Sequence, residues 1–262
     1  MGDSALQPLQ GIGVLVTRAR EQAGETISGL ESLGASVFSV PAIRIDYLTH
    51  PSGLDESLMN IGMYDHLVFT SVNGVYSFLR QIGPSHPEPG QMPSALCVGP
   101  KTAEAWRQAG GTVKAVPGKY SAADLVEVLG KDLDTVSLLI LRPEHVETTL
   151  GEELQKRGAR VDEVVLYRTV AGEENAESLD ALLKKEEVDV ILFASPSAVY
   201  GILSMTGGPE KIRDLLAVCI GPTTAKAAVD SGMKKVVFPE HYTSEGMVQV
   251  LLARAEEIRD RR

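Results

Sequence analysis

Hydroxyl-bearing side chains follow short apolar runs at four points of the chain. Thr70-Ser71 and Ser195-Pro196-Ser197 each follow a run that predicts a buried strand, and Gly99-Pro100-Lys101-Thr102 and Gly221-Pro222-Thr223-Thr224 each follow another. In an open parallel sheet, ligands bind beyond the carboxyl ends of the strands, where the next helices begin. Backbone N–H groups and hydroxyls at that edge would form a cradle for carboxylate or phosphate oxygens.

The alternative is that these side chains only cap helices, which is the commonest use of Ser, Thr and Asn at such positions. The same cradle occurs in both halves of the chain, which favours an anionic ligand bound by both. Its glycine allows the backbone to approach a ligand closely, and its proline fits the first turn of a helix. The candidate residues of these cradles are Thr70, Ser71, Asn73, Lys101, Thr102, Ser195, Ser197, Thr223 and Thr224.

Two arginines, Arg18 and Arg142, end strand-like runs at equivalent places. A guanidinium at a strand end can bind a carboxylate through two parallel hydrogen bonds, although it can also be a solvated charge. Lys101 is a further candidate cation, and because its counterpart is Thr223, the two halves of the chain are not equivalent there.

The sequence motifs of several common chemistries are missing. No Gly-x-Gly-x-x-Gly follows a strand, and the chain has no phosphate-binding Gly-x4-Gly-Lys-Ser/Thr loop, no Cys-x-x-Cys and no Gly-x-Ser-x-Gly. The five histidines are scattered. We therefore expect no nucleotide cofactor and no metal site, and we interpret Cys97 and Cys219 as core residues.

An internal repeat organises these positions. Residues 96–103 recur as 218–225 at an offset of 122, and residues 69–71 and 15–18 recur as 193–195 and 139–142 at an offset of 124. Several blocks in one order at nearly one offset indicate a duplicated half.

Within each half, apolar runs alternate with helical patterns. The first half predicts strands at 14–17, 36–40, 67–70, 95–98 and 112–116, and helices at 22–33, 72–80, 101–109 and 121–129, with Gly34 as a helix stop and Ser121 as an N-cap. Because uniformly apolar strands between helices favour parallel sheets covered on both faces, we predict an α/β fold of two similar doubly wound domains. Two extended stretches, 41–47 and 165–170, are predicted to link the domains.

Composition fits this organisation. The 262 residues are 44% hydrophobic and suffice for two modest domains, and no apolar run is long enough for a membrane helix. A net charge of −10 argues against nucleic-acid binding. Two cysteines do not make a disulfide framework, so a cytoplasmic location fits best.

The ordered pieces of the chain resemble the uroporphyrinogen-III synthase family from Val14 to Leu252. The pieces that carry the resemblance are residues 16–18, 69–75, 98–103, 166–169, 193–199, 220–225 and 242–246. The resemblance implies two lobes joined by a two-stranded β-ladder, with residues 1–40 and 171–262 forming a discontinuous first domain and residues 45–165 forming the second.

The resemblance also implies an activity. A cofactor-independent hydro-lyase of tetrapyrrole (porphyrin and heme) biosynthesis would cyclise hydroxymethylbilane to uroporphyrinogen III between the lobes, inverting the terminal pyrrole ring. Tyr167, which matches the family's tyrosine, would assist departure of the hydroxyl as a hydrogen-bond donor, unless it only packs on a domain edge. We expect the small-molecule substrate to be the only partner, and the chain to be a monomer.

Two other functions fit the same sequence features. A two-lobed binding or regulatory protein would close on an anionic ligand without chemistry, and product formation distinguishes it from an enzyme. A doubly wound enzyme acting on phosphate esters is disfavoured, because neither metal ligands nor a phosphate loop are visible.

Overall fold

The computed structural model describes residues 7–118, 122–130, 132–145 and 150–260. The chain divides into two compact units, unit 1 formed by Met1–Arg44 with Val170–Arg262 and unit 2 formed by Ile45–Thr169. No helix in the described ranges has the length and apolar character needed to cross a membrane. The predicted N-cap Ser121 lies outside the described residues.

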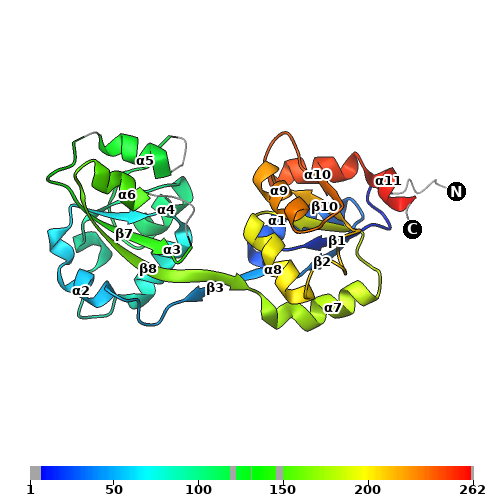
Figure 1. The fold of residues 1–262 in the computed structure, drawn as a ribbon, viewed down its shortest axis with the longest axis horizontal. Helices are drawn as coiled ribbons and strands as arrows, with labels where there is room; N and C mark the ends of the chain where they lie inside the picture. The colour runs from blue at the N-terminus through cyan, green and yellow to red at the C-terminus, as the bar shows by residue number, and fades with distance from the viewer. Residues whose placement is uncertain (1–6, 119–121, 131, 146–149, 261–262) are drawn as a thin grey trace. The chain divides into compact units, whose positions relative to one another are not determined.

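Unit 1 is built on a five-stranded sheet with the order β11-β10-β9-β1-β2. All of its pairings are parallel. The strands are β1 (Gly13–Val16), β2 (Ser36–Ser39), β9 (Val190–Phe193), β10 (Leu216–Cys219) and β11 (Lys235–Val237). Helices α1 (Arg20–Ser32), α10 (Ser244–Leu252) and α11 (Ala255–Arg259) cover one face, and α7 (Ala176–Lys184), α8 (Pro196–Thr206) and α9 (Pro222–Asp230) cover the other (Figure 1).

Unit 2 has a six-stranded sheet with the order β3-β8-β7-β4-β5-β6. Its strands are β3 (Ile43–Tyr47), β4 (His66–Phe69), β5 (Ser94–Cys97), β6 (Val113–Ala115), β7 (Ser137–Pro143) and β8 (Arg160–Ala171). Helices α2 (Leu54–Met59), α3 (Val72–Gln81) and α4 (Pro100–Gln108) lie on one face, and α5 (Ala122–Leu129) and α6 (Leu150–Lys156) on the other.

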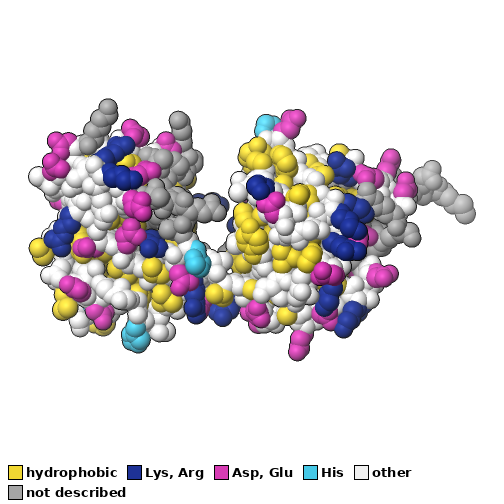
Figure 2. Space-filling model, viewed as in Figure 1, with side chains coloured by type: hydrophobic (Ala, Val, Ile, Leu, Met, Phe, Trp, Pro, Cys, Tyr) yellow, Lys and Arg dark blue, Asp and Glu magenta, His cyan; other side chains and the backbone are white. Residues whose placement is uncertain are grey.

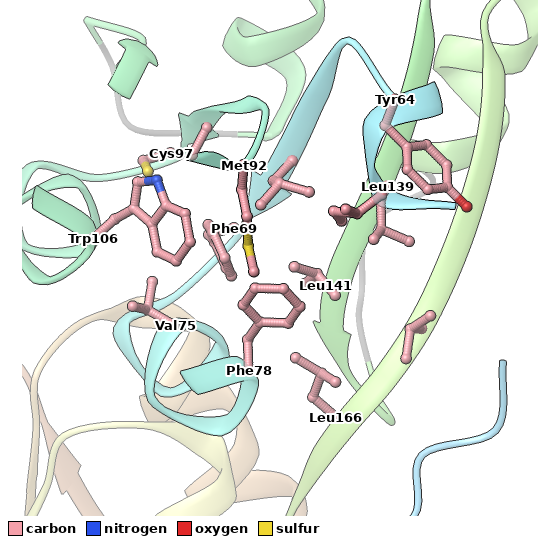
Figure 3. Close-up of a cluster of buried hydrophobic side chains, with 14 of the residues drawn as sticks. Tyr64, Phe69, Val75, Phe78, Met92, Cys97, Trp106, Leu139, Leu141 and Leu166 are labelled. Atoms are coloured by element: carbon pink, nitrogen blue, oxygen red, sulfur yellow. The ribbon is translucent and has the colours of Figure 1, made fainter. Parts of the chain in front are cut away.

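Successive side chains of the central strands point to opposite faces, so each strand contributes to the hydrophobic core on both faces of its sheet. In β4, Leu67 and Phe69 pack under α3 and α4, whereas Val68 packs under α5 and α6. In the first of these clusters the rings of Phe69, Phe78 and Trp106 pack against one another, with centroids 5.0–6.1 Å apart (Figure 3). Every residue of β4 after His66 is fully buried, which is why the strand is apolar throughout rather than alternating.

Strands β3 and β8 are the two stretches that run from one unit into the other. The amide of Leu48 donates to the carbonyl of Leu166, and the amide of Gly172 donates to the carbonyl of Ala42, so the two strands pair antiparallel. β8 is longer than the predicted stretch 165–170, because it begins at Arg160 and first pairs with β7.

The sequence repeat does not coincide with the two units. The offset of 124 relates β1 to β7 and β4 to β9, so each half of the chain contributes strands to both sheets. The predicted fold class, two doubly wound α/β domains with one discontinuous, is confirmed. Gly34, the predicted stop of α1, has a φ of 93°, a conformation that glycine adopts without strain.

Candidate active site

The candidate residues lie at the carboxyl edges of the two sheets, where each strand ends and a helix begins. In unit 2, α3 follows β4 and α4 follows β5. In unit 1, α8 follows β9 and α9 follows β10. The parallel pairing of these strands brings their ends to one edge of each sheet, which is the expected ligand edge of a doubly wound fold.

Two of the predicted cradles contain true helix caps. Ser71 precedes α3, and its Oγ accepts a hydrogen bond from the amide of Gly74 at 3.0 Å. Ser195 precedes α8, and its Oγ accepts from the amide of Ala198 at 3.3 Å and lies 2.9 Å from Oγ of Ser197. For Ser71 and Ser195 the capping interpretation therefore holds, whatever else they do.

The other two cradles are open. Gly99 and Gly221 occupy the N-cap positions of α4 and α9, and no side chain caps either helix. Thr102 and Thr224, each the third residue of its helix, are only 4% and 3% exposed. Neither hydroxyl has a hydrogen-bond partner among the described residues, and neither is fully enclosed, so each oxygen reaches the surface.

The remaining cradle residues are distributed around these helix starts. Lys101 and Thr223 are exposed in the first turns of α4 and α9. Thr70 and Asn73 are half-buried on either side of Ser71, and neither makes a side-chain hydrogen bond within the described ranges. They are therefore open to a ligand at the edge of unit 2.

The two arginines, although equivalent in the repeat, have different environments. Arg142 forms an ion pair with Glu163, and its Nη1 donates to the carbonyl oxygens of Pro143 at 2.9 Å and Glu144 at 3.2 Å. Arg18 is exposed and makes no ion pair in the part of the chain that the structure describes. It lines a small hollow at the end of β1 and β9, together with Gln22, Thr26, Ala194 and Ser244.

Arg142 is not free to bind a ligand in the same way as Arg18, because the carboxylate of Glu163 is its ion-pair partner. A Cβ placed on Gly151, in the first turn of α6, would collide with this carboxylate, so Glu163 lies over the start of that helix. A negative charge is favoured there by the helix dipole. The residue of unit 1 that is equivalent to Glu163 in the repeat is Ser39, whose Oγ donates to the carbonyl of Arg18 at 3.3 Å. No feature of the local sequence identifies Glu163 as the partner of Arg142.

Tyr167 and Ser71 form the closest pair of candidate residues. The Tyr167 hydroxyl lies 2.7 Å from Oγ of Ser71, within hydrogen-bond distance, and the tyrosine is only 4% exposed. Burial raises the pKa of Tyr167 above its usual value, the hydrogen bond from Ser71 opposes that shift, and the nearby Tyr47 adds to it. The phenol therefore keeps its proton across the neutral range.

Several candidate residues are thus brought together within each unit. Unit 2 holds Tyr167, Ser71, Thr70, Asn73, Lys101, Thr102 and Arg142, and unit 1 holds Arg18, Ser195, Ser197, Thr223 and Thr224. The hollow adds Gln22 and Ser244, which the sequence analysis did not single out, although Ser244 lies inside one of the segments that carry the resemblance.

The cysteines and acidic residues offer no further chemistry at these edges. Cys97 and Cys219 are fully buried, and burial raises the pKa of each thiol to about 12. Among the described residues, no group of three or more His, Cys, Asp or Glu side chains is arranged to hold a metal ion.

Comparison with known proteins covers most of the chain. Residues 24–249 match the family model described as uroporphyrinogen-III synthase HemD. The porphyrin biosynthesis protein HemD of Ruminiclostridium josui is 29% identical over 253 residues, which are 94% of this chain but only 49% of that protein. The chain thus spans about half the length of that relative. The uroporphyrinogen-III synthase of Synechococcus elongatus is 26% identical over 93% of this chain and 96% of its own length.

Solved structures agree with the fold. The uroporphyrinogen-III synthetase of Helicobacter pylori superposes with a TM-score of 0.66 at 20% identity, covering 92% of this chain and 99% of that one. A mutant uroporphyrinogen III synthase of Thermus thermophilus gives a TM-score of 0.61, also at 20% identity, covering 94% and 99%. At this identity the structural likeness shows the fold alone.

Proposed function

This chain belongs to the uroporphyrinogen-III synthase family, and we propose that it cyclises hydroxymethylbilane to uroporphyrinogen III with loss of water. In that reaction the terminal hydroxyl departs and leaves an azafulvene cation. A substituted carbon of the last pyrrole ring attacks the cation, and the resulting spiro intermediate fragments and recombines with that ring inverted. The sum of the steps is the loss of one water molecule without net oxidation, so no redox cofactor is required.

Such a substrate ionises readily, so the protein's main task is geometric. It must hold a flexible chain of four pyrrole rings with eight carboxylates so that the rearranging closure outruns the direct one. Hydrogen-bond donors suit that task better than a strong acid–base pair. The open helix starts and free hydroxyls of both units support this assignment.

Tyr167 is the proposed donor to the departing hydroxyl. Ser71 Oγ accepts the amide proton of Gly74, so when Ser71 donates its own proton to the phenol oxygen, the phenol proton is free for the substrate. The raised pKa of Tyr167 keeps that proton on the phenol at neutral pH. Ser71 then acts both as helix cap and as the group that orients the tyrosine.

The substrate carboxylates are proposed to bind at the open donors. Thr102 and Thr224 offer hydroxyls that reach the surface, Lys101 an exposed ammonium, and Arg18 a guanidinium that has no partner among the described residues. The contrast with unit 2 supports the role of Arg18, because the equivalent arginine there, Arg142, is already paired with Glu163. Thr70, Asn73, Ser195, Ser197 and Thr223 complete the proposed set, whereas Arg142 is best suited to fixing β7 against β8.

The observation that carries the proposal is the buried Tyr167–Ser71 pair in a member of this family. The test is to incubate the purified, metal-free protein with freshly generated hydroxymethylbilane and resolve the oxidised products by isomer. Predominant isomer III supports the synthase. Isomer I alone, formed at the rate of the protein-free control, would contradict it and leave an anion-binding protein without catalysis.

We further propose that the enzyme works as a monomer in the cytoplasm. Two buried thiols with strongly raised pKa values are compatible with a reducing compartment. Light scattering during size-exclusion chromatography should give the mass of one 28.1 kDa chain.

A further inference from the structure

Tyr242 lies against the backbone at the start of α9. It belongs to the loop between β11 and α10, and Gly221 is the N-cap of α9. A Cβ on Gly221 would lie 3.3 Å from Cγ, 3.5 Å from Cδ1 and 3.6 Å from Cδ2 of Tyr242. Because three adjoining ring atoms are almost equally distant, the ring packs on the glycine, and a larger residue at 221 would displace it.

Although it is fixed in this way, the ring remains largely exposed. Tyr242 is 58% exposed and its neighbour Phe238 is 45% exposed. The two rings pack edge to face with centroids 6.5 Å apart and an interplanar angle of 62°. Figure 2 shows hydrophobic side chains gathered over the region of α8 and α9. Large aromatic side chains that stay exposed next to one another are characteristic of binding surfaces.

Donors for an anion lie directly beside the ring. The N-terminus of α9 has no side-chain cap, and the first residue after Gly221 is a proline, so the next free amides belong to Thr223 and Thr224. The Thr224 side chain is almost completely buried, and its hydroxyl has no partner among the described residues. As the Cα–Cβ bonds of a helix tilt toward its N-terminus, this hydroxyl is directed to the same end as the amides.

A flat apolar surface beside anion donors fits a ligand that is both aromatic and acidic. Each pyrrole ring of the proposed substrate carries two carboxylate side chains, and pyrrole is an electron-rich ring. Two aromatic rings attract one another in offset or edge-to-face arrangements beyond the effect of burial alone. A carboxylate on a short side chain would then reach the helix start while its ring lies on the tyrosine.

We propose that Tyr242 is a positioning residue on which one pyrrole ring of the substrate packs while a carboxylate of that ring binds the N-terminus of α9 and the Thr224 hydroxyl. This inference rests on the proposed function. It adds an aromatic contact to a site otherwise made of polar donors. An aromatic contact restricts the orientation of the ring, which a carboxylate on a flexible side chain does not do alone.

The first test compares Tyr242→Leu with Tyr242→Phe in steady-state kinetics with hydroxymethylbilane. Removing the ring should raise KM about fivefold with little change in kcat, whereas the phenylalanine should restore KM to within about twofold of wild type. Tyr76→Leu is the matched control, because Tyr76 is a similarly exposed tyrosine on α3 of unit 2. Wild-type KM in Tyr242→Leu, with or without a lower melting temperature, would overturn the proposal.

A second test does not depend on turnover. Porphobilinogen, a monopyrrole with one acetate and one propionate, is titrated into protein whose tyrosine rings carry ¹³C, with the Tyr242 signals assigned from Tyr242→Phe. We expect the Tyr242 signals to shift and those of Tyr76 to stay, and Thr224→Val to weaken the response. Unshifted Tyr242 signals overturn the proposal. If wild-type protein forms no isomer III, the proposed function fails and this titration alone decides the role of Tyr242.

Discussion

Unit 1 and unit 2 have the same strand order at their cores, but their carboxyl edges are chemically different. Both keep an uncapped helix start with a buried threonine, Thr224 in one and Thr102 in the other. Tyr167 lies on β8 of the unit 2 sheet, and the residue equivalent to it in the repeat is Ile43, which has no hydroxyl. Of the two equivalent arginines, Arg142 is paired with Glu163, whereas Arg18 has no partner among the residues that the structure describes.

The hydrophobic cores of the two units also differ in their side chains. Unit 2 packs Phe69, Phe78 and Trp106 together, whereas the equivalent residues of unit 1 are Phe193, Ile202 and Ala228. The two units thus share the backbone N–H donors at their helix starts, because these follow from the common topology. They differ in the side chains around those donors. Under the proposed function, unit 2 would supply the reacting group and unit 1 would supply open binding groups.

The largest effect is expected in the core of unit 2. Trp106→Ala should lower the free energy of unfolding by about 3–5 kcal/mol, because a fully buried indole is lost together with the hydrogen bond that its Nε1 donates to the carbonyl oxygen of Thr112. Urea denaturation followed by circular dichroism measures it. The control Met59→Ala, at an exposed site of the same unit, should stay within about 0.5 kcal/mol of wild type.

Next in size is the removal of the proposed donor. Tyr167→Phe should lower kcat about a hundredfold, the lower end of the contribution of general acids, while KM and the melting temperature change little. Single-turnover formation of isomer III measures it, with Tyr76→Phe as the control. Undiminished turnover in Tyr167→Phe would remove the chemical distinction between the two units.

The two arginines should respond in opposite ways. Arg18→Gln should raise KM about tenfold and leave stability unchanged, since the guanidinium makes no hydrogen bond or ion pair with the part of the chain that the structure describes. Arg142→Gln should lower the free energy of unfolding by about 1–2 kcal/mol, because Glu163 loses its partner, and should leave KM unchanged. If both variants change KM equally, the two arginines have similar roles in substrate binding, although only Arg142 is paired with a carboxylate of the described residues.

The two capping serines provide a finer comparison. Ser71→Ala and Ser195→Ala should each cost about 1 kcal/mol of stability through loss of the cap. Only Ser71→Ala should also lower kcat, by roughly tenfold, because Tyr167 loses the group that orients it. Equal kcat values in the two variants would show that Ser71 does not orient Tyr167 for the reaction.

The smallest difference is expected at the cysteines. With a pKa of about 12, a thiolate fraction on the order of one in ten thousand is present at pH 8, so neither Cys97 nor Cys219 should react with a thiol reagent in the native protein. Both should react on unfolding. Selective labelling of one cysteine in the native protein would show that one unit opens more readily than the other.

The sequence alone determined the fold class and placed the candidate residues at the carboxyl edges of the sheets. Apolar runs, helical periodicity and glycine stops are local signals, and the repeat offset placed the same helix starts in both halves. The Gly-Pro pairs also marked the uncapped starts of α4 and α9, because a glycine at the N-cap has no side chain to cap the helix; that these starts bind a ligand stays a prediction.

Only the tertiary structure decided which side chains are engaged. Ser71 and Tyr167 lie 96 residues apart in the chain, and Arg142 and Glu163 lie 21 apart, so neither pair leaves a periodic trace in the sequence. The same holds for Tyr242 on Gly221. Two arginines at equivalent positions of the sequence repeat were indistinguishable until packing placed a carboxylate beside one of them, because an ion pair depends on distance in space rather than along the chain.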